Sequence, residues 1–308
     1  MSSRLYDCLT ITLNPAIDRT ITIPNFQAGK VNRVQSEYSN AGGKGVNVAS
    51  SLADAGHRVA VTGFLGRENA AIFERLFARK RISDHFVRLQ GETRVGIKIT
   101  DPILKETTDI NFAGAEPLSS DLASLRAEID RIDAEWYVLA GSLPPGVDTT
   151  IYKEIAASLK SRGRKVALDT SGETLNLAIE ALPAFIKPNI HELEALVGRA
   201  LSSREAVAAA AGELVARGIE TVVVSMGGEG ACFVGAEGLV FATPPAIEVR
   251  STVGAGDAMV AGVLSSKLRG LGLAETARLS TAFSVRAIGK FEADASIDAI
   301  SRKVALQN

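Results

Sequence analysis

A carboxylate stands where a glycine-containing turn meets a helix in the segment STVGAGDAMVAGVLSSKL (251–268). Apolar residues then recur every three or four positions and predict one face of a helix that begins near Asp257: Met259, Val260, Val263, Leu264 and Leu268. The first amides of a helix lack partners, and Gly254 and Gly256 let the turn bend sharply. The turn can therefore bind an anion while Asp257 accepts a proton. A structural role as the N-cap or a first-turn residue of the helix is the alternative for Asp257.

A second candidate segment, NAGGKGVNVA (40–49), places three glycines before a predicted helix. Glycine backbone can approach a ligand closely, and the amide of Asn47 offers both a donor and an acceptor to a hydroxyl. The spacing differs from the phosphate-binding patterns GxxxxGK(S/T) and GxGxxG, so this loop alone is weakly specific. The sharp turn GSLPPG (141–146) follows an apolar run, and a purely structural role is its alternative.

Two further segments hold groups that suit a cation and a nucleotide. KPNIHEL (187–193) carries Lys187, Asn189 and Glu192. Because Asn189 and Glu192 are three residues apart, both side chains can face an octahedral cation or its waters. SMGGEGA (225–231) is a flexible turn before a predicted hairpin, and it suits a position beside a nucleotide.

Short apolar, β-branched runs alternate with helical patterns along the chain. We predict strands at 8–13, 58–64, 136–142, 165–169, 185–189 and 221–227. We predict helices at 46–56, 71–80, 121–132 and 203–218. This alternation indicates a mainly parallel sheet that helices cover on both faces, in an α/β fold. Ligands bind such sheets beyond the carboxyl ends of the strands, where most of these polar segments fall.

Two pairs of stretches alternate polar and apolar residues, as half-exposed antiparallel strands do. They are 18–26 with 32–39, and 93–100 with 107–114. We predict that they form a small sheet, assembled from about 18–39 and 93–114, that projects from a single domain of residues 1–308. Such a sheet is a candidate lid, and an edge sheet or a subunit interface is the alternative. We expect a homodimer through the lid because its strands would otherwise expose apolar side chains: Ile21, Ile23, Ile97 and Ile99.

Composition excludes several classes of function. The chain has 308 residues, of which 46% are hydrophobic, and its 34 basic and 35 acidic residues give a formal net charge of −1. This balance disfavours nucleic-acid and membrane-surface partners. Only three histidines occur, none in a metal-binding spacing, and the two cysteines lie in apolar runs typical of buried thiols. No export signal or membrane span is visible, so we expect a cytoplasmic protein.

Taken in order, these segments resemble the ribokinase-like (PfkB) family of sugar kinases over nearly the whole chain. The resemblance rests on TLNPAID (12–18), GGKGVN (42–47), GSLPPG (141–146), KPN with Glu192, SMGGEGA (225–231) and STVGAGD (251–257). Within the family, GETR (91–94) and ETTDINFAG (106–114) are most similar to the branch that phosphorylates ketohexose phosphates. The resemblance implies a three-layer α/β/α core with a β-sheet lid. Ala258 stands where this branch often has a serine.

The resemblance assigns a role to each matching position. Asp257 matches the catalytic base, and Gly254, Ala255 and Gly256 match the anion hole. The positions that match the sugar-phosphate site are Asp18, Lys30, Gly42, Gly43, Asn47, Arg94 and Ser142, with Lys30 and Arg94 near the existing phosphate. The positions that match the nucleotide site are Lys187, Asn189, Ser225, Gly227 and Gly230. Glu192 and Asn189 match the positions that hold Mg²⁺.

The resemblance implies that ATP donates its γ-phosphate to fructose 1-phosphate, giving fructose 1,6-bisphosphate, with Mg²⁺ as cofactor. Fructose 6-phosphate and tagatose 6-phosphate remain alternative acceptors, because they differ only in phosphate position or in one stereocentre. A kinase of nucleosides or unphosphorylated sugars would not explain the pair Arg94 and Lys30. A sensor that binds the same ligands without turnover would have no need of a general base at Asp257.

Overall fold

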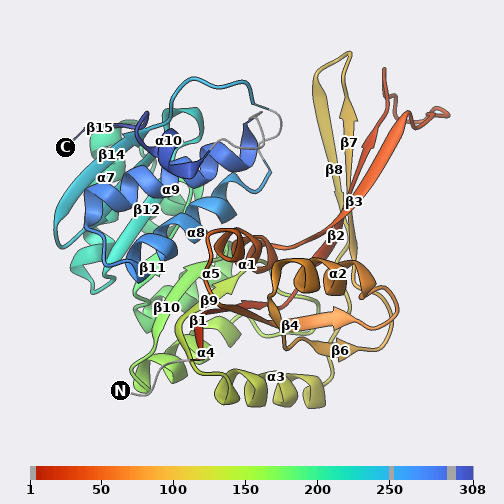
Figure 1. The fold of residues 1–308 in the computed structure, drawn as a ribbon, viewed down its shortest axis with the longest axis horizontal. Coiled ribbons are helices and arrows are strands. Elements are labelled where there is room, and N and C mark those ends of the chain that lie inside the picture. The colour runs from red at the N-terminus through yellow and green to blue at the C-terminus, as the bar shows by residue number, and fades with distance from the viewer. Residues whose placement is uncertain (1–4, 250–252, 290–295, 308) are drawn as a thin grey trace.

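The computed structural model describes residues 5–249, 253–289 and 296–307. Ser251 and Thr252, the first two residues of the STVGAGD motif, lie outside the described residues. The described chain forms a large central sheet between two layers of helices and a smaller sheet that projects from it (Figure 1).

Eight strands of the central sheet run parallel, and a three-stranded antiparallel extension follows them at one edge. The strand order is β15-β14-β13-β12-β11-β10-β9-β1-β4-β5, with the short β6 (Val87–Leu89) also paired to β4. The strands are β1 (Tyr6–Thr12), β4 (Val59–Gly66), β5 (Ser83–Asp84), β9 (Ala134–Ala140), β10 (Lys165–Asp169), β11 (Phe185–Ile186), β12 (Thr221–Ser225), β13 (Ala231–Gly235), β14 (Gly238–Thr243) and β15 (Ala305–Gln307). The predicted parallel sheet is confirmed, although β11 is shorter than predicted.

Helices cover both faces of this sheet, because successive strand residues point to opposite sides. On one face lie α1 (Lys44–Asp54), α2 (Ala71–Lys80), α8 (Ala255–Leu268) and α9 (Leu273–Ile288). On the other lie α3 (Ser119–Arg131), α4 (Ile151–Ser161), α5 (Gly172–Ala178), α6 (Ile190–Val197) and α7 (Arg204–Ala216). In β1, Cys8 packs into the first core while Leu9 and Ile11 pack into the second. The remaining short helix, α10 (Ile297–Ser301), packs against α9.

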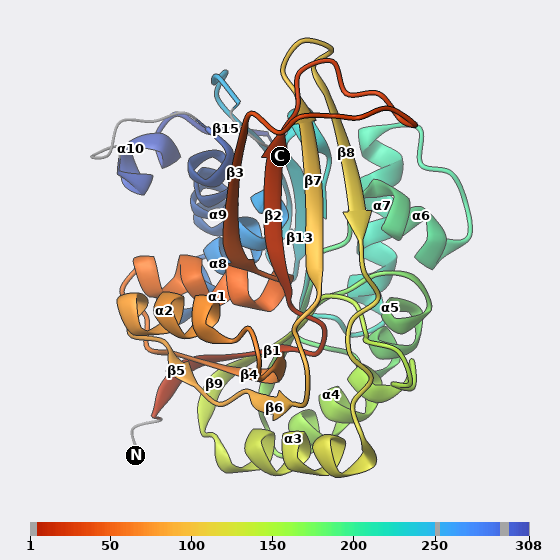
Figure 2. The ribbon, with the colours of Figure 1, turned by 90° about the vertical axis from the view of Figure 1, so that its right-hand side faces the viewer.

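The smaller sheet contains four strands in the order β3-β2-β7-β8 (Figure 2). They are β2 (Ala16–Thr22), β3 (Ser36–Gly42), β7 (Val95–Asp101) and β8 (Glu106–Asn111). Two hairpin-like pairs from separate parts of the chain meet because β2 and β7 pair in parallel. The prediction that two separated segments build one small sheet is therefore confirmed, with strand bounds shifted by a few residues.

The prediction of exposed isoleucines on this sheet is wrong. Ile23 and Ile99 are buried, and Ile21 and Ile97 are partly covered. Other large apolar side chains are instead exposed on the sheet and its loops: Val31, Val34, Tyr38, Ile103, Leu104, Ile110 and Phe112. The strand pattern fixes which side of the sheet a residue faces, but the burial of that side depends on the loops that fold over it.

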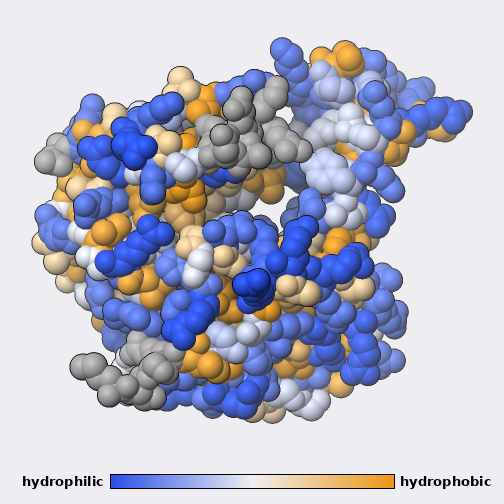
Figure 3. Space-filling view, viewed as in Figure 1, coloured by the Kyte–Doolittle hydropathy of each residue, from blue (hydrophilic) through white to orange (hydrophobic). Residues whose placement is uncertain are grey.

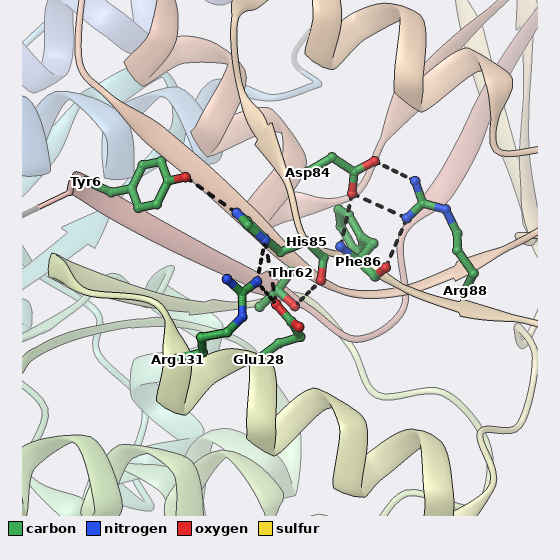
Figure 4. Close-up of polar contacts among 8 residues, drawn as sticks. All are labelled: Tyr6, Thr62, Asp84, His85, Phe86, Arg88, Glu128 and Arg131. Carbon is green, nitrogen blue, oxygen red and sulfur yellow. Dashed lines mark hydrogen bonds and ion pairs between the residues drawn. The ribbon is translucent and has the colours of Figure 1, made fainter.

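A polar network fastens the parallel edge of the central sheet to α3 (Figure 4). The Arg131 guanidinium lies 2.5 Å from a Glu128 oxygen and 3.0 Å from Nδ1 of His85, the residue after β5. The main-chain oxygen of His85 accepts a hydrogen bond of 2.8 Å from Thr62 on β4. Tyr6, at the amino end of β1, lies 3.5 Å from the other ring nitrogen. This network therefore links β1, β4 and the residue after β5 to the last turn of α3.

Among the described residues, no helix combines the length and the apolar character that crossing a membrane requires. Both cysteines are free and buried, as predicted. Burial raises the pKa of both thiols, that of Cys232 to about 12, so neither is a reactive thiolate at neutral pH.

Candidate active site

The glycine-containing turn before α8 presents free amides, as the sequence predicts. Gly254 is the N-cap residue with φ 81°, a left-handed conformation that favours glycine. The helix begins at Ala255, two residues before the predicted start, so the amides of residues 255–257 precede the first internal hydrogen bond, from Ala258 to Gly254. The N-cap residue is therefore Gly254, so Asp257 is not the cap but lies in the first turn of the helix, the other position that its structural alternative allows.

Helix α8 is also more deeply buried than its sequence pattern predicts. Ten consecutive residues, from Asp257 to Ser266, are buried, so the helix has no solvent face along this stretch. Helix α9 packs closely against α8 and covers the side of α8 that carries small or polar residues. One of these residues, Ser266, donates a hydrogen bond from its hydroxyl to the carbonyl of Gly262 in the same helix. The predicted apolar face is packed in the core, and the opposite side of the helix is buried as well, because small residues can be buried without being strongly apolar.

The Asp257 carboxylate is 8% exposed and accepts a hydrogen bond of 2.8 Å from the Nδ2 of Asn47, on α1. Burial raises the pKa of Asp257 to about 6, and the nearby carboxylate of Asp169 raises it as well. The hydrogen bond from Asn47 and the positive charges of Lys44 and Lys187 oppose this rise. Asp257 is thus ionised at neutral pH with a pKa close enough to neutrality for a general base.

Asp257 opens onto a cavity of about 280 Å³. The cavity lies where the small sheet meets the carboxyl ends of the central strands, and Figure 3 shows a notch between the projecting sheet and the main body. Its lining residues are Asn14, Ala16, Asp18, Gly43, Lys44, Asn47, Arg94, Asn111, Gly141, Ser142, Ser171 and Asp257. A ligand that carries several hydroxyl groups can therefore enter this polar cavity and reach the carboxylate of Asp257.

Two lysines share one buried carboxylate next to Asp257. Asp169, the last residue of β10, is 1% exposed, and its Oδ1 lies 3.0 Å from the Nζ of Lys44 and 3.6 Å from that of Lys187. Burial alone would raise the pKa of Asp169, but the two ammonium groups hold it below its ordinary value. The other oxygen of Asp169 has no hydrogen-bond partner among the described residues.

Arg94, which also lines the cavity, is held by main-chain carbonyls. Its guanidinium donates to the carbonyl of Asn14 at 3.1 and 3.3 Å, and to that of Phe112 at 3.2 Å. The Asn14 side chain in turn donates to the carbonyls of Ala113 and Leu143. Burial lowers the pKa of Arg94, although Asp18 partly compensates. The guanidinium therefore stays charged, with a fixed orientation and donors left for a ligand.

The glycines of the NAGGKG loop have a packing role that the sequence does not reveal. A side chain at Gly42 would overlap the Asp18 carboxylate, and one at Gly43 would meet the backbone of Pro15 at 2.9 Å. Gly43 is also the N-cap of α1 and has φ 106°. These glycines thus allow the β1–β2 connection and the start of α1 to lie close together, which brings Asp18 and Asn47 to the same cavity.

The segments at the ends of β11 and β12 lie side by side. Asn189 and Ser225 form a parallel bridge, and the Ser225 amide donates to the carbonyl of Pro188 at 3.0 Å. The turn after β12 contains a short 3₁₀ helix, Gly227–Glu229, and leads into the β13–β14 hairpin, as predicted. The positions predicted for the nucleotide are therefore neighbours. Lys187 also lies beside the predicted anion hole, because its Nζ would be 3.2 Å from a β-carbon placed on Gly256.

Proteins of one kinase family are similar to this chain over most of its length. A family model described as pfkB family carbohydrate kinase matches residues 9–300. The chain belongs to this family. The 1-phosphofructokinase of Rhodobacter capsulatus is 50% identical to this pfkB kinase over 284 residues, covering 91% of this chain and 90% of that protein. The 1-phosphofructokinase of Xanthomonas campestris is 44% identical over 90% of this chain and 89% of that protein.

A solved structure of Escherichia coli phosphofructokinase-2 in complex with substrates and products has the same fold. It superposes on this pfkB kinase with a TM-score of 0.90 and 28% identity, and the match covers 98% of both chains. The predicted ribokinase-like fold, with its mostly parallel central sheet and separate smaller sheet, is confirmed.

The structure brings five of the seven residues predicted for the sugar-phosphate site to one cavity, but neither Gly42 nor Lys30 lines it. Gly42 instead lies against the Asp18 carboxylate. Lys30 lies on the exposed loop between β2 and β3, and its main chain is bonded to Gln27 and Asn32. It does not line the cavity in this chain. Its predicted role stays a prediction, while Asp18, Gly43, Asn47, Arg94 and Ser142 are at the cavity.

Among the polar residues of the site, sequence reasoning missed Asn14, Lys44, Asn111, Asp169 and Ser171. Lys44 lies inside the GGKG segment, and Asp169 ends a correctly predicted strand, so their positions carried a signal. The sequence contained no signal that these two residues form an ion pair with each other, because they are 125 positions apart in the chain.

Asn189 and Glu192 form a reciprocal capping box at the start of α6. The Asn189 side chain accepts from the Glu192 amide at 2.9 Å, and the Glu192 carboxylate accepts from the Asn189 amide at 2.8 Å. Among the described residues, no group of three or more His, Cys, Asp or Glu side chains is arranged to hold a metal. Magnesium bound together with a nucleotide needs only one or two carboxylates, so a site for it does not require such a group.

Proposed function

We propose that this pfkB kinase transfers the γ-phosphate of ATP to fructose 1-phosphate, giving fructose 1,6-bisphosphate. The observation that carries the proposal is a buried carboxylate, Asp257, in the first turn of a helix, which lines a polar cavity together with the guanidinium of Arg94. The similarity to proteins named 1-phosphofructokinase supports the choice of acceptor.

In the proposed reaction, Asp257 accepts the proton of the acceptor hydroxyl. The sugar oxygen forms its bond to the γ-phosphorus as the bond from that phosphorus to ADP breaks. The hydrogen bond from Asn47 orients the carboxylate, and the amides of residues 255–257 stabilise the negative charge that develops on the transferred group. One turn of the chain thus supplies both the base and the anion hole.

The acceptor's hydroxyls would be bound by Asp18, Asn47, Ser142 and the Gly42–Gly43 backbone. Its existing phosphate would be bound by Arg94, whose planar guanidinium can hold two phosphate oxygens at once. Lys30 would add a second positive charge near this phosphate. A phosphorylated sugar thereby gains a charged contact that an unphosphorylated sugar cannot make.

The nucleotide would lie along Lys187, Asn189, Ser225, Gly227 and Gly230, with its phosphates directed to the start of α8. Glu192 and Asn189 would hold Mg²⁺, with the free oxygen of Asp169 nearby. When bound, Mg²⁺ neutralises phosphate charge. Lys187 and Lys44 place positive charge on the same side as the anion hole.

The small sheet would act as a lid because it carries Asp18 and Asn111, and Arg94 directly precedes β7. Binding of the substrate phosphate by Arg94 would therefore favour a closed site. We also propose that two copies of the chain form a homodimer through these lids, which would cover their exposed apolar side chains.

A coupled assay of ADP release with ATP, Mg²⁺ and a panel of hexoses and hexose phosphates tests the proposal. We expect turnover with fructose 1-phosphate, and a loss on the order of 10²–10⁴ in kcat for Asp257→Asn without loss of substrate binding. Preference for fructose 6-phosphate or tagatose 6-phosphate would correct the acceptor. Activity only on unphosphorylated sugars would overturn the substrate class, and binding without turnover would indicate a sensor.

A further inference from the structure

Asn111 is the last residue of β8 and the only residue of that strand, within the described chain, that lines the cavity. Its side chain makes no hydrogen bond with another described residue, so both its amide oxygen and its amide nitrogen are available. The next residue, Phe112, gives its carbonyl to the Arg94 guanidinium, which ties the backbone at this point to the phosphate-binding side of the cavity.

Asn111 stands in one row with Asp18 across the small sheet. Gly96 on β7 pairs with Asp18 on β2 at one side and with Asn111 on β8 at the other. Cross-strand partners have side chains on the same face of a sheet, so all three positions face the cavity. Because Gly96 has no side chain, a gap separates the side chains of Asp18 and Asn111.

Two oxygen atoms border this gap symmetrically. A β-carbon placed on Gly96 would lie 3.4 Å from Oδ1 of Asp18 and 3.4 Å from Oδ1 of Asn111. The Asp18 carboxylate can only accept hydrogen bonds, whereas the Asn111 amide can rotate to present either its oxygen or its NH₂ group. A ligand atom in the gap therefore meets a fixed acceptor on one side and an adaptable partner on the other.

The chemistry of the gap selects a hydroxyl. A phosphate oxygen there would be repelled by the Asp18 carboxylate, and an apolar group would leave both side chains without partners. A hydroxyl can donate to Asp18 and accept from Asn111 at the same time. Building on the proposed function, we propose that Asp18 and Asn111 bind one hydroxyl of the sugar phosphate over Gly96, which makes Asn111 a specificity-determining residue of this kinase.

Steady-state kinetics with fructose 1-phosphate, and with ATP varied separately, test this assignment. Asn111→Leu keeps the size of the side chain and removes its hydrogen bonds, so we expect KM for the sugar phosphate to rise about 5- to 100-fold while KM for ATP stays unchanged. Thr108→Val, on the same strand but on the other face, is the matched control and should change neither value.

Two further variants separate binding of a hydroxyl from a purely structural role. Gly96→Ala requires no unusual backbone angle and puts a methyl group into the gap at ordinary contact distance, so it should raise the same KM without lowering the melting temperature. In the double variant Asp18→Asn with Asn111→Leu, the effects should be less than additive because both residues hold the same hydroxyl.

Unchanged sugar-phosphate KM values in Asn111→Leu and Gly96→Ala, with an active wild-type enzyme, would overturn this assignment alone. Strict additivity in the double variant would likewise show that the two side chains do not share one ligand atom. A wild-type chain that phosphorylates no sugar phosphate would overturn the proposed function itself, and the assignment with it.

Discussion

At the scale of single residues, the environment of Asp257 sets its chemistry. Four polar groups from three other parts of the chain surround this carboxylate: Asn47 and Lys44 on α1, Asp169 on β10, and Lys187 after β11. The buried position and Asp169 raise its pKa, whereas Asn47 and the lysines lower it. These opposing effects together set the pKa of Asp257, so a single substitution nearby can shift that pKa.

The first prediction concerns the pH dependence of kcat/KM. The raised pKa of Asp257, about 6, means that the carboxylate becomes protonated and inactive as the pH falls through that value. We expect kcat/KM to be constant near pH 7–8 and to fall about tenfold per pH unit well below pH 6. A profile that stays flat to pH 4.5 would contradict a role for Asp257 as the base.

Sugar phosphates also titrate near pH 6, so a variant must separate enzyme from substrate. Lys44→Met removes a positive charge that lowers the pKa of Asp257. In this variant, the fall of kcat/KM at acidic pH should therefore occur at a higher pH, whereas the pKa of the substrate stays the same. Lys153→Met, which removes an exposed lysine paired with Glu180 on the protein surface, is the matched control and should leave the limb in place.

A second residue-scale prediction concerns Arg94. Asn14 and Phe112 fix its guanidinium through their carbonyls, so Arg94→Ala removes a preoriented cation from the lining of the cavity. We expect KM for the sugar phosphate to rise at least tenfold, with KM for ATP changed far less, because a charged hydrogen-bonded contact is lost only from the acceptor. Equal effects on the two KM values in steady-state assays would remove Arg94 from this role.

At the scale of elements, the position of Asp257 depends on how α8 packs. A side chain at Gly262 would overlap the backbone of Ser280 on α9, so the two helices lie in direct contact there. The hydroxyl of Ser284 also donates to the carbonyl of Ala255, at the first turn of α8, at 2.7 Å. Helix α9 thus helps to hold the start of α8, where the anion hole and the base lie.

We therefore expect Gly262→Ala to destabilise the protein by roughly 1–3 kcal/mol, because the added methyl group pushes α9 away. The chain offers a matched control in Gly212 on α7, where a β-carbon would meet nothing within 4 Å. Gly212→Ala should be neutral or stabilising by about 0.5–1 kcal/mol. Thermal unfolding measures both, and similar melting temperatures for the two variants would contradict this view of the α8–α9 contact.

At the scale of the whole molecule, the projecting small sheet and its loops expose several large apolar side chains to solvent. Phe112 is 54% exposed, Ile103 is 61% exposed and Val31 is 88% exposed, all on this sheet or its loops. Figure 1 shows the sheet projecting away from the helical layers. Within the described part of the chain, these side chains are left exposed to solvent. This surface is the basis for the proposed homodimer.

The prediction for the assembly is a particle with twice the 32.4 kDa mass of the chain in light-scattering measurements at micromolar concentration. Ile110, which is 45% exposed on β8, faces away from the cavity, and Ile110→Asp should shift the particle to a monomer because a charge there opposes burial. Leu118→Asp, at an exposed apolar position before α3, should not. A wild-type monomer, or a dimer in Ile110→Asp, would contradict pairing through the lids.

The sequence alone determined the elements and most of the chemistry. Apolar runs such as 165–169 and helical patterns such as 71–80 were predicted to the residue, because each depends on the period of side chains along one segment. The turn before Asp257 was recognised for the same reason, since glycines and a helix start are local features.

Only the tertiary structure decided which distant groups meet. Lys44 and Asp169 form an ion pair, and Asp18 and Asn111 border one gap, because strand order and register bring them together from separate segments. It also decided that Ile23 and Ile99 are buried and that Lys30 lies away from this chain's cavity. Local periodicity cannot encode these contacts, because they depend on how separate segments pack in space.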